Sequence, residues 1–130
     1  MCHGMSIKLE HTHVDTWLAV VMENDAMRVV VVPEIGGKIT SLVSRRTGRE
    51  WLWKNPHLPL IKPPPDATDF GAFDAGGWDE VIPTVNRCRV PNSAWGERTL
   101  TDHGELWTDE GARVILIVPP EEHLPASMLA

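Results

Sequence analysis

The stretch that decides the fold is Thr16–Val32, TWLAVVMENDAMRVVVV, in which two runs of aliphatic and β-branched residues flank a polar tetrapeptide. Such runs favour β-strands, and the Asn and Asp within residues 23–26 favour a turn between them. We therefore predict a hairpin of residues 16–22 and 27–32. The second strand is apolar on nearly both faces, which is typical of a strand inside stacked sheets. The stretch indicates an all-β protein built as an antiparallel β-sandwich.

The segment that follows continues the β pattern. Pro33 and the paired glycines Gly36 and Gly37 predict a chain reversal, because proline donates no ladder hydrogen bond and glycine permits positive φ. Residues 38–44 then alternate polar and apolar side chains, which predicts a further strand.

Residues 49–53 predict another strand, and its two tryptophans, Trp51 and Trp53, are spaced to lie on one side of it. Alternate spacing on a strand is how sheets line their cores, so we expect both indoles inside the sandwich rather than in a binding site. The prolines of residues 54–69 exclude a helix or an interior strand and predict a stiff surface connection.

Two clusters of functional side chains, residues 74–80 and 102–107, set carboxylates beside a tryptophan, and the second cluster adds His103. Carboxylates accept hydrogen bonds from sugar hydroxyls, while an indole offers a flat apolar surface to the C–H face of a pyranose. The clusters therefore indicate a site for a neutral, hydroxyl-rich ligand, and carbohydrate is the ligand that fits best.

These clusters also resemble a known family. The motif GGWDExxPT at residues 76–84, followed by DHGELW at residues 102–107, resembles the galactose mutarotase-like superfamily, and most closely its uncharacterised aldose 1-epimerase-like branch. The likeness includes residues 32–39 and 48–53 and covers roughly residues 14 to 108. It implies the N-terminal portion of a large antiparallel supersandwich whose intact members interconvert sugar anomers.

The resemblance assigns roles to individual residues. It implies that the His103 imidazole contacts the sugar, and Asp102 is placed to orient the ring. Asn86-Arg87 echoes an Asn-Arg pair that aldose 1-epimerases place beside the sugar. The predicted substrate-binding residues are His103, Glu105, Trp107, Trp78, Asp79, Glu80 and Arg87. Asp79 and Glu80 are neighbours, so in extended chain only one of them faces the ligand, and residues 76–80 are equally well read as a structural turn.

Mutarotation needs an acid and a base that open and reclose the sugar ring without a cofactor. By the resemblance, both groups belong to a later part of the family's chain, and no residue here matches either of them. The predicted function is therefore sugar binding with little catalysis. The alternative is a non-catalytic sugar-binding or interaction module, or an inert fragment.

The family's sandwich is normally about twice as long as this chain. We expect an N-terminal extension at residues 1–13, a partial domain at 14–118 that includes a strand at 113–118, and an atypical tail at 119–130. This division is typical of a truncated or frame-shifted reading. An uncovered sheet in such a partial domain is expected to associate with another copy of itself.

Composition excludes several other classes of protein. The net charge is −6 at pH 7, no basic cluster marks a nucleic-acid site, and the apolar runs are too short to cross a bilayer. We expect a cytoplasmic protein with free thiols at Cys2 and Cys88 and with no cofactor or metal. His11 and His13 predict a solvated strand edge, because nothing near them in sequence completes a metal shell.

Overall fold

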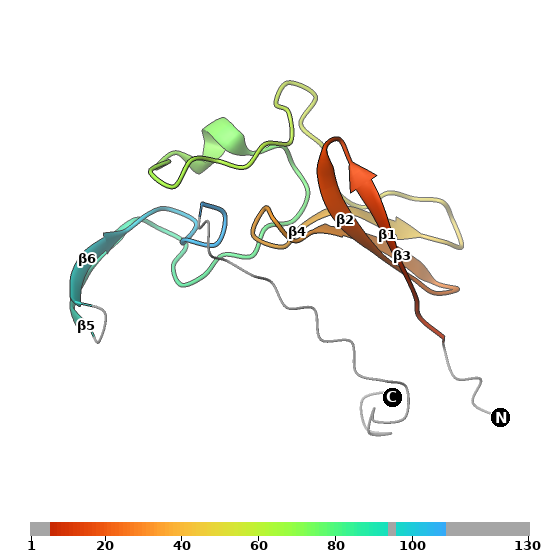
Figure 1. The fold of residues 1–130 in the computed structure, drawn as a ribbon, viewed down its shortest axis with the longest axis horizontal. Helices are drawn as coiled ribbons and strands as arrows, with labels where there is room; N and C mark the ends of the chain where they lie inside the picture. The colour runs from red at the N-terminus through yellow and green to blue at the C-terminus, as the bar shows by residue number, and fades with distance from the viewer. Residues whose placement is uncertain (1–5, 94–95, 109–130) are drawn as a thin grey trace.

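The structure is a computed structural model that describes residues 6–93 and 96–108, and its main element is a four-stranded antiparallel sheet of order β1-β2-β3-β4. The strands are β1 Lys8–Val14, β2 Trp17–Glu23, β3 Met27–Val32 and β4 Lys38–Ser44. Figure 1 shows them side by side in one twisted layer. The predicted hairpin and the predicted strand at residues 38–44 are confirmed.

The turn between β2 and β3 is built by Asn24. Its side-chain oxygen accepts hydrogen bonds from the backbone N–H groups of Ala26 at 2.9 Å and Met27 at 2.8 Å. An asparagine that bonds the backbone two or three residues further on imitates a backbone turn, which is why this residue type favours the position. Local chemistry therefore closes the hairpin that the sequence predicts.

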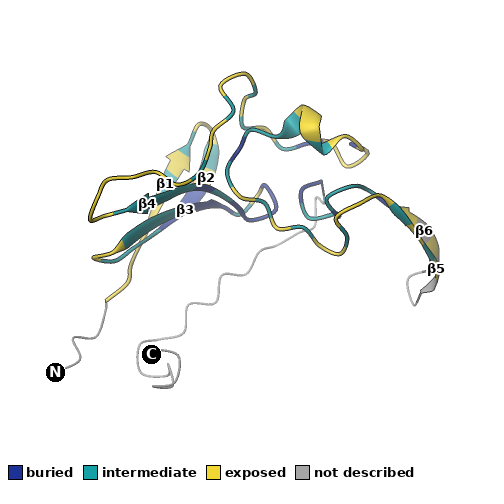
Figure 2. Ribbon diagram, turned by 180° about the vertical axis from the view of Figure 1, so that it is seen from behind, coloured by how far each residue is buried: buried dark blue, intermediate teal, exposed yellow. Residues whose placement is uncertain are grey.

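The core lies on one face of the sheet, which we call the inner face. Its buried residues are Ala19, Val21, Val30, Val32 and Ile35, and Val14, Trp17 and Leu60 pack against them. Leu60 belongs to the proline-rich connection of residues 54–69, and the Trp17 indole N–H donates to the Leu60 carbonyl at 3.0 Å. The connection is thereby fastened over the inner face. Figure 2 shows the buried residues gathered in β2, in β3 and in the loop after β3.

The remaining elements are the 3-10 helix η1 Phe70–Phe73 and the strands β5 Cys88–Ser93 and β6 Gly96–Leu100. β5 and β6 form a separate two-stranded antiparallel sheet, which extends away from the main sheet in Figure 1. The all-β antiparallel class is confirmed, and the two sheets are consistent with a sandwich. The residues that the structure describes include no helix long and apolar enough to cross a membrane.

Several smaller expectations concern the two ends of the chain and its cysteines. β1 begins within the segment that we assigned to an N-terminal extension and takes up its residues 8–13. The His11 and His13 side chains on it are exposed, as predicted for a solvated strand edge. Cys88 is a free thiol, whereas Cys2, the predicted strand at 113–118 and the tail at 119–130 lie outside the described residues.

Residues 49–53 do not form the predicted strand. The Glu50 side chain accepts backbone N–H groups that a neighbouring strand would otherwise bind. Pairing with β4 is limited to Glu50 opposite Val43 and to two backbone hydrogen bonds of 2.9 Å, from Ser44 N–H to the Arg49 carbonyl and from Trp51 N–H to the Leu42 carbonyl. The Glu50 carboxylate accepts hydrogen bonds from the Ser41 hydroxyl at 2.6 Å and from the Leu42 N–H at 2.8 Å. The same carboxylate accepts the Leu52 N–H at 3.0 Å, where the chain bends. A side chain that bonds two backbone amides in this way competes with a regular ladder.

The two tryptophans of this segment are consequently on the surface. Trp51 is 54% exposed and Trp53 is 61% exposed, so the expectation that they fill the core was wrong. The Arg49 guanidinium lies 4.3 Å from the centre of the Trp51 ring, in a cation–π contact that an exposed indole allows. Alternate spacing lines a core only along a continuous strand, and here backbone pairing with β4 ends at Trp51, where Glu50 takes the Leu42 and Leu52 amides.

The Glu50 contacts predict a pH dependence of stability. Burial alone would raise the pKa of the Glu50 carboxyl, but hydrogen bonds from Ser41 and from the amides of Leu42, Leu52 and Trp51 outweigh burial and lower the pKa below 4.5. A group whose pKa is lowered by folding stabilises the fold above its unfolded pKa, and that contribution disappears as the pH falls through the folded pKa.

We therefore expect the melting temperature of the wild-type chain to fall more steeply below about pH 4.5 than that of Glu50→Gln. Thermal unfolding followed by circular dichroism from pH 7 downwards measures this difference. Glu34→Gln, at an exposed glutamate between β3 and β4, is the matched control and should keep the wild-type slope. Parallel curves for the wild type and Glu50→Gln would contradict the assignment.

Candidate functional site

The turn at residues 101–104 carries the predicted sugar-binding histidine. His103 has a φ of 57° and Gly104 a φ of 76°, both in the left-handed region. A non-glycine residue is uncommon there and is held only when its surroundings impose the conformation. Here the His103 N–H donates to the Val85 carbonyl at 2.7 Å, and the Glu105 N–H donates to the Ile82 carbonyl at 2.8 Å. Residues 82–85 thus fix the turn.

The His103 imidazole is oriented from two sides. Its ring stacks on the Phe70 ring of η1, with centroids 4.1 Å apart and planes inclined by 10°. Its Nδ1 lies 3.3 Å from Oδ2 of Asp102. Of the two tautomers of a neutral imidazole, a carboxylate beside Nδ1 favours the one that carries its hydrogen on Nδ1, which leaves Nε2 as an acceptor. The side chain is still partly exposed, so an oriented imidazole is open to a ligand.

Trp107 supports this turn from inside the protein. The side chain is buried, and its indole N–H lies 3.1 Å from the Asp102 carbonyl and 3.0 Å from the Gly104 carbonyl. Its ring also meets the Phe70 ring edge-on at 5.3 Å. Buried indoles usually satisfy their N–H in this manner. Trp107 therefore holds His103 in place instead of presenting a surface for sugar stacking.

Asp79 is likewise engaged within the protein. Its carboxylate forms an ion pair with the Lys38 ammonium at the start of β4, and the two side chains are 14% and 4% exposed. Lys38 and Asp79 line a small cavity together with Phe70 and Trp107. Burial of a charged side chain requires a partner of opposite charge, and each of these residues is that partner for the other. Asp79 is therefore held by Lys38 next to Phe70 and Trp107, the two rings that support the turn at residues 101–104, which we call the histidine turn.

Gly76 and Gly77 have structural roles. Their φ values are 82° and 87°. A Cβ on Gly77 would lie 2.6 Å from the Ile39 carbonyl oxygen, and one on Gly76 would overlap the Trp53 carbonyl oxygen. The glycines therefore let residues 76–78 pack directly on the backbone of β4 and of residues 53–54, as the structural-turn interpretation predicts. Trp78 then pairs with Ile39 through two backbone hydrogen bonds of 2.9 Å.

The other predicted site residues lie at different places. Trp78, Glu80 and Arg87 are exposed, and Glu105 is half-buried next to the histidine turn. Asp79 is largely buried where its neighbour Glu80 is exposed, as the alternation of side chains in extended chain predicts. The structure thus places Glu105 and Trp107 next to the turn that carries His103, and Asp79 lines a small cavity together with Trp107.

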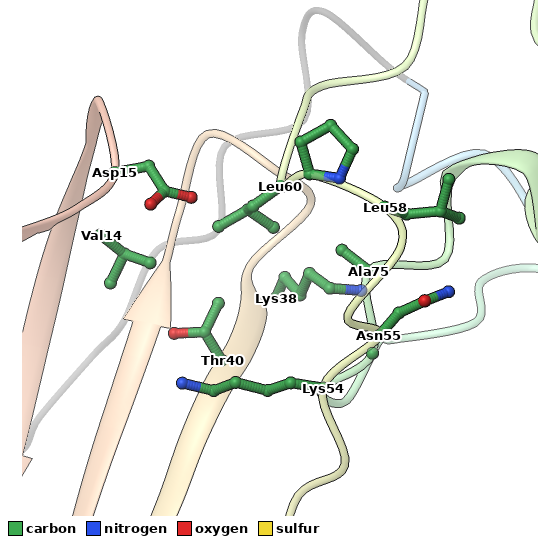
Figure 3. A pocket seen from close by; sticks show the side chains of 12 residues that line it. Val14, Asp15, Lys38, Thr40, Lys54, Asn55, Leu58, Leu60 and Ala75 are labelled. Atoms are coloured by element: carbon green, nitrogen blue, oxygen red, sulfur yellow. The ribbon is translucent and has the colours of Figure 1, made fainter.

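A cavity of about 260 Å³ lies against the inner face, and none of the predicted residues lines it. Figure 3 shows Lys38, Thr40 and Lys54 around it, with Asn55 and the apolar Leu60. This volume is just below the about 300–1,000 Å³ of typical ligand pockets, so it suits one small polar molecule. The sequence signal for this cavity was the alternation of Lys38 and Thr40 with Ile39. Polar residues on a buried face of a sheet need polar partners, which a cavity with a polar ligand supplies.

Comparison with known proteins gives one match. Residues 4–87 match a protein-family model described as a domain of unknown function, DUF5107. The match includes the four-stranded sheet and the residues 76–80 but ends before His103. Searches of curated proteins and of solved structures found no match.

Proposed function

The chain belongs to the DUF5107 family, and we propose that it binds carbohydrate as an aldose 1-epimerase-like protein in which His103 contacts the sugar. The observation that carries the proposal is the conformation of His103. The residue is held in the left-handed region, stacked on Phe70 and hydrogen-bonded to Asp102, and it is nevertheless accessible. A strained residue that is fixed yet accessible is typical of a functional site.

The chemistry of the turn suits a sugar hydroxyl. An imidazole that gives its Nδ1–H to a carboxylate presents Nε2 as an acceptor for a hydroxyl hydrogen, without any change in charge. Glu105 lies two residues further along the chain, on a backbone fastened to Ile82, and offers a carboxylate from the same turn. The resemblance of residues 76–84 and 102–107 to the galactose mutarotase-like superfamily supports the same ligand class.

Binding is proposed with little catalysis. Anomer interconversion needs a base at the anomeric hydroxyl and an acid at the ring oxygen. No residue of this chain matches the acid or the base of the galactose mutarotase-like superfamily that it resembles. The Asp79 carboxylate is largely buried and paired with the Lys38 ammonium within the protein, so it does not serve as that base in the proposal.

A titration with a panel of hexoses and pentoses, by protein NMR or calorimetry, tests the proposal. His103→Ala is expected to weaken binding of the preferred sugar by about tenfold or more, because a hydrogen bond to the ligand is lost. His57→Ala, at an exposed histidine in the proline-rich connection, is the matched control and should bind as the wild type does. Lys54→Ala locates the ligand, since a loss confined to that variant would place the sugar in the cavity of Figure 3.

Polarimetric mutarotation of glucose and galactose on the same samples separates binding from catalysis. Binding that depends on His103 without acceleration of mutarotation is the expected result. Acceleration that disappears in His103→Ala would mean that this chain supplies an acid and a base after all. No binding by the folded wild-type chain would overturn the proposal and leave an interaction module or an inert fragment.

A further inference from the structure

The four-stranded sheet has a second face, which we call the outer face, and the pairing register shows which residues lie on it. Directly opposed residues of antiparallel strands share a face. One row across all four strands therefore consists of Leu9, Met22, Val29 and Leu42. The core residues Val21 and Val30 oppose each other in the alternate row, so the first row is on the outer face.

A second row of the outer face begins at the edge strand β1 and crosses the whole sheet. It consists of His11, Val20, Val31, Ile39 and Trp78, of which Val31 is already buried in the single chain. Leu18, opposite His13, continues the same face. Neither row contains a Lys, Arg, Asp or Glu, whereas the inner side of the same strands carries Glu23 opposite Arg28.

This arrangement is the reverse of what a solvated face requires. An antiparallel sheet with one face in water normally places its polar side chains on that face. Here the outer face holds exposed Leu9, Leu18 and Trp78, while the proline-rich connection covers the inner face. A contiguous apolar face of this kind marks an interaction surface.

Charge and area indicate what covers the outer face. The charges that give the chain its net charge of −6 lie outside the two rows, so two copies that meet through these rows set no like charges directly opposite each other. The strands are six or seven residues long, which corresponds to a length of about 23 Å at the usual rise per residue. The four strands and the segments that bridge β4 span a width of about 24 Å at the usual strand spacing. Two copies would bury about 1,100 Å² in total, which is at the lower end for a specific interface.

We propose that two copies of this chain pack outer face against outer face, with a two-fold axis through the interface. Sheets stacked in this way lie about 10 Å apart and complete a β-sandwich. Pairing through the edge of β1 is disfavoured, because that edge presents an ion pair of Lys8 and Glu10 with N–O distance 2.5 Å and the two exposed histidines.

Leu18→Glu tests the proposal, because Leu18 lies on the outer face of β2 and is 44% exposed in the single chain. A glutamate there leaves the monomer folded but places a charge in the apolar interface of both copies, so the dimer dissociation constant should rise about a hundredfold. Ile61→Glu is the matched control, because Ile61 is 43% exposed and lies in the connection over the inner face. Analytical ultracentrifugation over a range of concentrations gives the association constants, and circular dichroism checks folding.

The expected result is a wild-type dimer, a dimer for Ile61→Glu and a monomer for Leu18→Glu. Should Leu18→Glu fail to fold, Leu9→Glu on the neighbouring strand of the same face replaces it. A wild-type chain that is monomeric at every concentration overturns the proposal. Equal weakening by Ile61→Glu and Leu18→Glu overturns it as well, as does a dimer that survives Leu18→Glu, which would point to pairing through the edge of β1.

Discussion

Replacing Asp79 by alanine is expected to lower the free energy of unfolding by about 3–5 kcal/mol, because it leaves the Lys38 ammonium buried without its partner. Lys38 is 4% exposed and Asp79 is 14% exposed, so water screens neither charge well. The loss is measurable by urea unfolding, followed through tryptophan fluorescence. Glu80→Ala is the matched control, since this neighbouring carboxylate is exposed and its removal should change the stability by less than about 0.5 kcal/mol.

The double variant Lys38→Met with Asp79→Leu separates charge from packing. Replacing a buried ion pair by apolar residues of similar size is often neutral, so most of the lost stability should return. If Asp79 acts only through Lys38, the double variant should also keep the sugar affinity of the wild type. A stability loss in Asp79→Ala no larger than that in Glu80→Ala would show that the ion pair is not buried in solution.

Gly104→Ala is expected to cost about 3 kcal/mol or more, because a steric overlap adds to an unfavourable backbone conformation. A Cβ at this position would overlap the Ile82 carbonyl oxygen, and the φ of Gly104 is 76°. To relieve the overlap, the turn must move away from Ile82. That movement breaks the hydrogen bond that the Glu105 N–H donates to the Ile82 carbonyl. Because His103 precedes this glycine, sugar binding should be lost together with stability.

Gly48→Ala isolates the backbone contribution. Gly48 has a φ of 69°, and a Cβ there would meet nothing within 4 Å. Only the cost of the left-handed conformation remains, which is about 1–2 kcal/mol. Urea unfolding of both variants should therefore separate them clearly, and equal losses would contradict the close packing of Gly104 against Ile82.

The strands could be predicted because their signals are local. Aliphatic and β-branched runs at residues 16–22 and 27–32 favour extended chain wherever they lie, and Asn24 closes its turn through hydrogen bonds within three residues. The same holds for the strand at residues 38–44, which follows a proline and two glycines. The histidine turn could be singled out because its residue types are unusual together, and the placement of Asp102 beside the ring is seen in the structure.

The prediction for Trp51 and Trp53 failed because it assumed a regular ladder. The Glu50 carboxylate competes for the Leu42 and Leu52 amides, and nothing in the alternation of residues 49–53 announces that competition. For Trp107 and Asp79 too, the residue type did not reveal which groups each side chain meets in the folded chain. Both were predicted to contact sugar from their chemistry, yet one is buried under the histidine turn and the other is paired with Lys38.

By itself the sequence determined the all-β class, the hairpin of residues 16–32 and the strand at 38–44, and it singled out His103 as a candidate site residue. These depend on backbone preferences and on hydrogen bonds between near neighbours. Only the tertiary structure decided that Lys38 is buried against Asp79, 41 residues away, that the tryptophans of residues 51–53 face solvent, and that the charge-free rows lie on the outer face. Those outcomes depend on which groups meet across the chain, and long-range pairing leaves no periodic signal in the residues it joins.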